Sequence, residues 1–139
     1  MKGKTMTKNE KKCADLVHQK YQDTLKYYQD AFNYFEQDED KRKPNEDYEH
    51  YKDFFDYVNQ SGLCFDFVEA NTFEDQKCGY WRFQMSWGGP SDEFRIYTDM
   101  NKTIHEIEYW YLDWYDGACI NVPRDTVSWD ICSWYMDLA

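Results

Sequence analysis

The spacing of apolar residues changes abruptly at Gly62, and this change constrains the fold more than any other feature. Before Gly62, apolar and aromatic side chains recur every three or four positions, which is typical of one face of an α-helix. Between residues 63 and 122 they alternate with polar residues, which is typical of strands with one buried face. After Pro123 the helical spacing returns. We therefore predict an α+β fold, with helices at both ends of the chain and a sheet between them.

Two helices are predicted before the change of spacing. The first is expected to begin at Thr7, because Thr7 and Glu10 have the spacing of a capping box, and to continue for about 30 residues toward Pro44. The second begins near Asn45 and ends at residue 61. Because a short polar turn joins them, residues 7–61 are expected to form a helical hairpin.

Four to five strands are predicted in the sheet segment, residues 63–122. Short turns separate these strands, so we expect an antiparallel meander. Residues 125–138 carry a helical apolar stripe behind a good N-cap at Asp125, which predicts a C-terminal helix. Nothing in the sequence has the composition of a linker, so we predict that residues 1–139 form a single domain.

The composition of the chain limits both its state and its partners. It has 16 Lys and Arg against 27 Asp and Glu, a net charge of −11. That charge argues against a nucleic-acid binder that neutralises phosphates, and against docking on an anionic membrane. A mean hydropathy of −0.99 is typical of disorder, but aromatic residues make up 20% of the chain. Because disordered chains are poor in aromatic residues, we expect a folded protein with an aromatic core.

The sequence contains no pattern typical of a targeting segment, a metal site or a cofactor site. Its basic N-terminus is not followed by an apolar segment, which predicts no signal peptide, and no run is long enough to span a membrane. Nucleotide-binding glycine motifs and metal-ligand spacings are missing, so we expect no cofactor and no metal. A cytoplasmic protein with free thiols is therefore expected from the odd number of cysteines, which are Cys13, Cys64, Cys78, Cys119 and Cys132.

Acidic residues in the predicted second helix form the first candidate site. Glu46, Glu49, Asp53 and Asp56 recur at intervals of three, four and three residues, which places them on one face of a helix. One interpretation is a solvated face that keeps the protein soluble. The other is a ladder of charges that imitates a phosphate backbone and attracts a partner's basic groove.

The segment 104–114 forms the second candidate site. Its alternation places Glu106, Glu108, Trp110 and Trp114 on one face and residues such as Ile107 on the other. Exposed Trp and Tyr residues beside carboxylates are typical of a binding surface. The residues predicted to bind a partner here are Glu106, Glu108, Trp110, Asp113, Trp114 and Asp116. The alternative is that helices cover both faces of the sheet and that these rings belong to the core.

The same segment also fits a catalytic or sugar-binding site. Asp113 and Asp116, flanked by Trp110 and Trp114, have the residue types of an acid–base pair beside a stacked sugar. However, Asp116 and Gly117 are also good residues for a hairpin turn, which explains Asp116 without catalysis. A small enzyme or sugar-binding module is therefore kept as an alternative to a non-catalytic protein.

Residues 85–94 and 109–118 resemble runs in small orphan proteins of bacterial phages and plasmids. The short, acidic, aromatic-rich chain is also similar to anti-CRISPR and antirestriction proteins. That resemblance implies a non-catalytic inhibitor in the cytoplasm of an infected bacterial host. Its partner would be a host defence nuclease, or the nucleoprotein complex of that nuclease, with a basic groove that the acidic residues occlude.

A homodimer is a further alternative. The long first helix would pair with a copy of itself if its tyrosine rings are exposed, and exposed apolar patches are typical of interfaces. The tyrosines concerned are Tyr21, Tyr27, Tyr28 and Tyr34.

Overall fold

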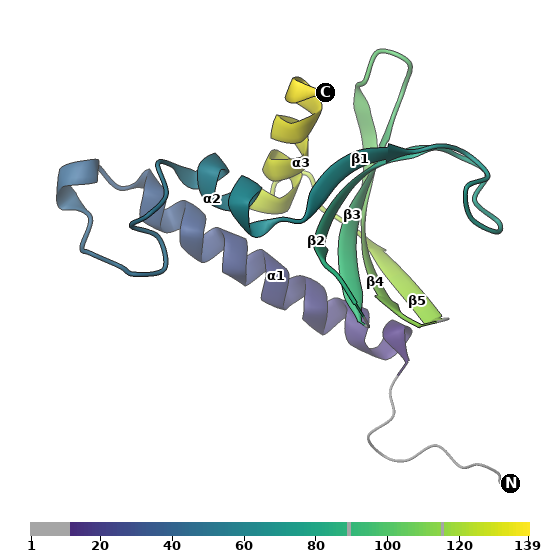
Figure 1. The fold of residues 1–139 in the computed structure, drawn as a ribbon, viewed down its shortest axis with the longest axis horizontal. Helices are drawn as coiled ribbons and strands as arrows, with labels where there is room; N and C mark the ends of the chain where they lie inside the picture. Colours follow the sequence, from purple (N-terminus) through teal and green to yellow (C-terminus); the bar gives the residue numbers. More distant parts are fainter. Residues whose placement is uncertain (1–11, 89, 115) are drawn as a thin grey trace, which may run out of the picture.

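The computed structural model describes residues 12–88, 90–114 and 116–139. Along the chain, the order of elements is helix, helix, five strands and helix, with a short 3-10 turn after the first helix (Figure 1). The elements are α1 (Cys13–Glu36), η1 (Glu39–Lys41), α2 (Phe54–Ser61), β1 (Cys64–Val68), β2 (Tyr80–Ser86), β3 (Ser91–Thr98), β4 (Ile104–Asp113), β5 (Asp116–Asn121) and α3 (Val127–Leu138).

The five strands form one antiparallel sheet in the order β1-β2-β3-β4-β5. The predicted α+β class and the predicted meander are therefore confirmed. Polar turns fix the hairpins locally. In the β3–β4 turn, for example, the Asp99 carboxylate accepts hydrogen bonds from the N–H groups of Asn101 and Thr103.

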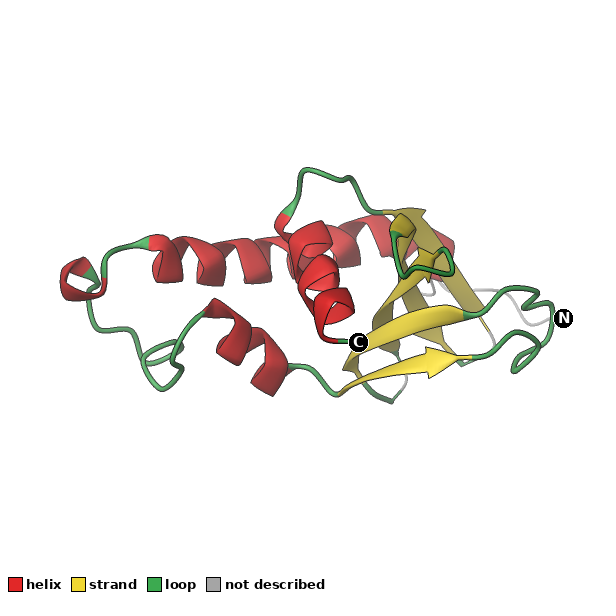
Figure 2. Cartoon of the chain, turned by 90° about the horizontal axis from the view of Figure 1, so that it is seen from above, coloured by secondary structure: helices red, strands yellow, loops and turns green. Residues whose placement is uncertain are grey.

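The helices cover one face of the sheet, and the core lies between them (Figures 1 and 2). On that face Phe83, Phe94 and Tyr109 are at most 1% exposed. Tyr109 packs against Tyr21 of α1, with ring centroids 5.5 Å apart, and Phe83 packs against Tyr135 of α3 at 4.6 Å. The expected aromatic core is thus present, and it is built from alternate residues of the strands.

The predicted second helix is shorter than expected, because α2 begins at Phe54 and residues 46–53 form turns. Side chains that bind the backbone explain the difference. The Asp53 carboxylate accepts a hydrogen bond from the Asp56 N–H, and the Asp56 carboxylate accepts one from the Lys52 N–H. These bonds hold Asp53 as the N-cap in extended conformation, so the helix begins after it.

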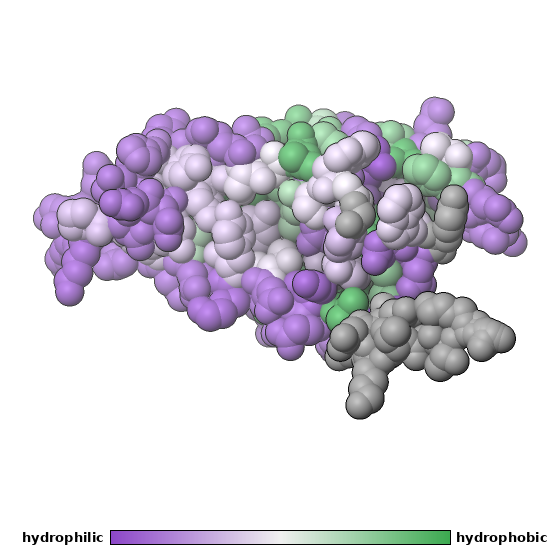
Figure 3. Space-filling model, turned by 60° about the horizontal axis from the view of Figure 1, so that its bottom comes forward, coloured by the Kyte–Doolittle hydropathy of each residue, from purple (hydrophilic) through white to green (hydrophobic). Residues whose placement is uncertain are grey.

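Aromatic packing, and not helical geometry, explains the apolar periodicity before α2. Tyr48 and Tyr51 both contact the Tyr57 ring from turns, at centroid distances of 5.3 and 5.0 Å. Glu46 and Glu49 are exposed on these turns. The end of the molecule that carries η1 is hydrophilic in Figure 3. The prediction that Glu46, Glu49, Asp53 and Asp56 share one helical face is therefore wrong.

The helix starts also differ in detail from the predictions. The predicted cap at Thr7 lies outside the described residues, and α1 begins with Lys12 as its N-cap. The N-cap of α3 is Thr126 and not Asp125, because the Thr126 hydroxyl accepts a hydrogen bond from the Trp129 N–H. No helix in the described ranges combines the length and apolar character needed to cross a membrane.

The tyrosines of α1 mostly face inward. Tyr21 and Tyr28 are 3% and 2% exposed, whereas Tyr27 is 48% exposed. Tyr34 is half-buried against Tyr48. The condition stated for a dimer through this helix, exposed tyrosine rings, is therefore met only by Tyr27. None of the five cysteines is paired with another in the structure.

Candidate binding site on the open face of the sheet

The face of the sheet opposite the helices is called here the open face. It contains a cavity of about 880 Å³. Ligand pockets are usually roughly 300–1,000 Å³, so this cavity has the size of a ligand site. Phe73 and Glu74 of the β1–β2 loop and Trp114 of the β4–β5 turn contribute to its lining. In Figure 1 the β1–β2 loop extends from the sheet on the side away from the helices.

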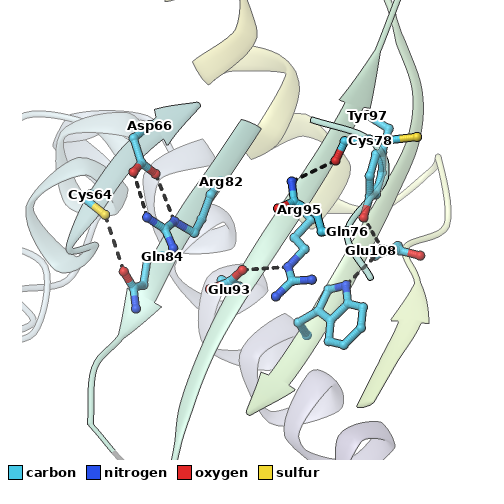
Figure 4. Close-up of polar contacts among 11 residues, drawn as sticks. Cys64, Asp66, Gln76, Cys78, Arg82, Gln84, Glu93, Arg95, Tyr97 and Glu108 are labelled. Carbon is cyan, nitrogen blue, oxygen red and sulfur yellow. Dashed lines mark hydrogen bonds and ion pairs between the residues drawn. The ribbon is translucent and has the colours of Figure 1, made fainter. Parts of the chain in front are cut away.

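A row of charged residues crosses the open face. Strand register places Asp66 of β1 opposite Arg82 of β2, Arg82 opposite Arg95 of β3, and Arg95 opposite Glu108 of β4. Two arginines are therefore direct cross-strand neighbours, an arrangement that destabilises a sheet unless other groups compensate. Asp66 compensates Arg82 with two hydrogen bonds, which are 3.0 and 2.7 Å long (Figure 4).

The guanidinium of Arg95 is held on three sides. Its Nε donates a 2.7 Å hydrogen bond to Glu93 (Figure 4). Its central carbon lies 4.0 Å from the ring centroid of Trp110 on β4 and 4.7 Å from that of Tyr80 on β2. Such contacts between a cation and aromatic faces are attractive. Among the described residues, nothing accepts a hydrogen bond from the two Nη atoms of Arg95.

Three buried polar groups line the same cavity as Arg95. The Glu93 side chain is only 3% exposed, and Gln84 is 5% exposed. Gln84 accepts a weak hydrogen bond from the Cys64 thiol, and its amide nitrogen has no partner among the described residues. Tyr80 also lines the cavity, and its buried hydroxyl has no partner within the described part of the chain. Burial raises the pKa of Tyr80. The cavity thus has unused hydrogen-bond donors in its wall.

Glu108 positions the aromatic side of the cavity. It accepts hydrogen bonds from the Tyr97 hydroxyl at 2.7 Å and from the indole nitrogen of Trp110 at 2.9 Å. Burial raises the pKa of Tyr97, and the hydrogen bond to Glu108 raises it further. Burial, together with the charge of Glu108, also raises the pKa of Cys119 on β5 to about 11. Glu108 therefore fixes the orientation of the Trp110 ring, which in turn contacts Arg95.

The structure brings part of the predicted aromatic and acidic strand together. Glu106, Glu108 and Trp110 lie on the open face, whereas Ile107 is buried beneath the helices, as the alternation predicted. The alternative in which helices cover both faces is not observed in the described residues. Trp114 is an exception, because β4 ends at Asp113 and Trp114 lies in the following turn with φ of 55°. It is 87% exposed at the rim of the cavity.

Asp113 and Asp116 face one another across the β4–β5 turn, but Asp116 is already engaged. Its carboxylate accepts a 2.6 Å hydrogen bond from the backbone N–H of Cys13, the first residue of α1. This bond lowers the pKa of Asp116. A carboxylate at the N-terminus of a helix is favourable, so the position of Asp116 has a structural explanation.

Sequence reasoning missed the residues at the centre of the cavity, namely Arg82, Glu93 and Arg95. Their signal was present, since each occupies a polar position in an alternating strand. That pattern gives the face of each residue but not its cross-strand partner, which depends on register. The juxtaposition of the two arginines was therefore not accessible from the sequence.

Neither a metal-binding group nor a similar protein indicates what this site binds. Within the described ranges, no three His, Cys, Asp or Glu residues are grouped so that they would hold a metal ion. Comparison of the chain with family models, with curated proteins and with solved structures found no match.

Proposed function

We propose that this protein is a non-catalytic binding protein and that the open face of its sheet is the interface. The cavity and its exposed aromatic rim carry the proposal. Trp114 is 87% exposed, and Trp87, in the β2–β3 turn at the same end of the sheet, is 78% exposed. Trp is enriched among residues that dominate binding energy, and exposed Trp has no role in the core.

The backbone of Trp114 supports this proposal independently. Its φ of 55° lies in the left-handed region, which is unfavourable for a bulky residue. Strained conformations that persist are concentrated at functional sites. A large apolar ring held in a strained turn and exposed to water is therefore better explained by binding than by stability.

We propose a partner with a basic surface. Residues 44–139 have six basic and nineteen acidic residues, a net charge of −13, so the sheet and its surroundings are strongly acidic. Such a charge steers a basic partner toward the protein and increases the rate of association. The proposed partner remains a host defence nuclease complex, whose basic nucleic-acid or target-recognition groove the protein would occlude without catalysis.

Co-purification at two salt concentrations tests this function. Immobilised wild-type protein and the Trp114→Ala variant are incubated with lysates of bacteria that carry a CRISPR or restriction system. Met100, which is 99% exposed in the turn at the other end of the sheet, supplies the matched Met100→Ala control. At low salt we expect wild type and Met100→Ala to retain the nuclease complex and Trp114→Ala to lose most of it. At high salt we expect wild type to retain less of the complex, because salt screens the attraction between opposite charges.

The proposed function also requires that the bound nuclease complex stops cleaving its target. Adding the wild-type protein to the purified nuclease complex should inhibit target cleavage at a stoichiometric ratio, whereas Trp114→Ala should inhibit it weakly. A complex retained equally by all three proteins, or one that cleaves at its full rate when saturated, would contradict the proposed function.

A further inference from the structure

We propose that the cavity on the open face binds a monocarboxylate that has an aromatic body. The carboxylate would bind the free edge of the Arg95 guanidinium, and the aromatic body would lie against Trp110 and Leu112. This site goes beyond the proposed function, which assigns a protein partner to the open face but no small ligand to its cavity. Because the site is tested with small molecules on the isolated protein, its failure can be distinguished from a failure of the proposed function.

The first argument is that the fold does not need these charges. Replacing a buried ion pair by apolar residues of similar volume is often neutral or stabilising. Here Glu93 and Arg95 are paired at 2.7 Å with side chains only 3% and 15% exposed, and a second arginine, Arg82, lies directly across from Arg95. This ion pair adds little stability and places two cations side by side. Its presence is therefore better explained by the binding of a ligand than by a role in the fold.

The second argument is the geometry of Arg95. A guanidinium matches a carboxylate through two parallel N–H donors, and this match needs a fixed plane. Glu93 accepts a hydrogen bond from Nε, on the side edge that Nε shares with one Nη atom, and this bond fixes the plane of the guanidinium. Trp110 and Tyr80, on the strands that flank β3, contact it from either side. The Nη edge is left as a preorganised fork without an acceptor among the described residues.

The third argument is the rest of the cavity. The amide nitrogen of Gln84 and the hydroxyl of Tyr80 are further donors without partners in the described residues. The Tyr80 hydroxyl is buried, and because a buried polar group that has no partner is unfavourable, a ligand oxygen within reach would relieve that cost. Trp110, Leu112 and the exposed Trp114 supply apolar surface on the β4 side of the same cavity. A ligand that fits therefore combines an oxygen acceptor pair with an aromatic body.

The charges of the cavity limit the anion to a single negative charge. Arg82 is already neutralised by Asp66, and Arg95 is in contact with the buried carboxylate of Glu93. Glu74 adds another carboxylate to the lining. A dianion such as a phosphate would meet these carboxylates in a region of low dielectric, where repulsion is strong. A monocarboxylate presents two oxygen acceptors that match the guanidinium fork, and it has half the negative charge of a dianion.

Two sources share this chemistry, namely a free aromatic acid and the C-terminal carboxylate of a polypeptide that ends in an aromatic residue. The probes are 2-naphthoate for the first source and N-acetyl-phenylalanine for the second. Each has a matched neutral control, 2-naphthamide and N-acetyl-phenylalaninamide, that keeps the aromatic body and removes the charge. Inorganic phosphate tests whether an anion that has no aromatic ring binds to the cavity.

Isothermal titration calorimetry on the full chain decides the outcome. We expect at least one carboxylate to bind and its amide to bind about tenfold more weakly or not at all, because the fork needs two acceptors. Arg95→Lys keeps the charge and loses the fork, so it should weaken binding about tenfold. Arg124→Lys is the matched control, since Arg124 also contacts a tryptophan ring, that of Trp129, but lies outside the cavity lining, and it should leave the affinity unchanged.

Nitrogen-15 spectra locate the bound probe. Saturation with the bound carboxylate should shift the Arg95 Nε–H and Trp110 indole N–H resonances more than the Lys or Gln side-chain signals of α1. Comparison of wild type with acid and amide probes decides the question even if Arg95→Lys does not fold. Equal affinity for acid and amide, binding of phosphate alone, or no binding of either carboxylate at millimolar concentration would overturn the proposal.

Discussion

Removing the cation of the buried ion pair should destabilise the protein strongly. In Arg95→Met the carboxylate of Glu93 loses its partner while only 3% of its side chain is exposed. Breaking a buried pair in this way usually destabilises by roughly 3–5 kcal/mol. Because 15% of the Arg95 side chain is exposed toward the cavity, we expect the lower end of that range, about 3 kcal/mol. Loss of the contact with Trp110, which is 4.0 Å from Arg95, acts in the same direction.

The neighbouring pair supplies a matched control. Arg82→Met removes a chemically identical group from the same face, but its partner Asp66 is 45% exposed and can be solvated. We expect a loss of about 1 kcal/mol or less. The double variant Glu93→Met/Arg95→Met removes both buried charges, so it should be more stable than Arg95→Met alone.

Urea unfolding followed by circular dichroism measures these differences. The midpoint should fall in the order wild type, Arg82→Met, Arg95→Met, while the slope stays constant if the unfolding remains two-state. Equal losses for the two arginine variants would refute the reasoning, because burial of the partner would then not decide the cost. A double variant no more stable than Arg95→Met would refute it as well.

Three further predictions concern other parts of the chain. The Cys13 N–H lowers the pKa of Asp116 below its ordinary value of 3.8, so Asp116 contributes stability above that pH and loses it as pH falls through the lowered pKa. The melting temperature of Asp116→Asn should therefore lie below that of wild type at neutral pH, and thermal melts should show this difference shrinking as the pH falls below 3.8. Trp114→Asn places a residue that tolerates φ of 55° in the turn, so urea unfolding should show a gain of about 1 kcal/mol together with weaker partner binding. Alkylation of the native protein, followed by mass spectrometry, should modify exposed Cys64 and Cys78 first and Cys132 only after unfolding, because Cys132 is fully buried and burial raises its pKa.

The order and type of most elements could be predicted because each follows from a local spacing. Strands with one covered face alternate, and the change at Gly62 marks the end of α2 within one residue. The segment before α2 was mispredicted because aromatic residues at 48 and 51 have helical spacing but are held by turns. There, the carboxylates of Asp53 and Asp56 bind backbone N–H groups, and such bonds compete with helix formation.

The candidate site was only partly predictable for a different reason. Alternation assigned Trp110 and Glu108 to one face, and the structure agrees. The contact of Arg95 with both Trp110 and Tyr80 joins three strands, and it depends on register and on the curvature of the sheet. Neither property is encoded in the spacing within a single strand. Trp114 could not be placed either, because its turn begins one residue earlier than the alternation predicts.

The packing of α1 has a consequence for the order in which the chain folds during synthesis. This helix is translated before the other described elements, yet besides α2 it packs on β4, β5 and α3, which are translated last. Its first N–H group binds Asp116, which lies 103 residues farther along the chain. Adjacent strands of the meander can pair as they leave the ribosome, and the C-terminal half of α1 can pack on α2, which follows it closely in the chain. The N-terminal half of α1 packs on β4 and β5, so its apolar face stays uncovered until the end of the sheet has been synthesised.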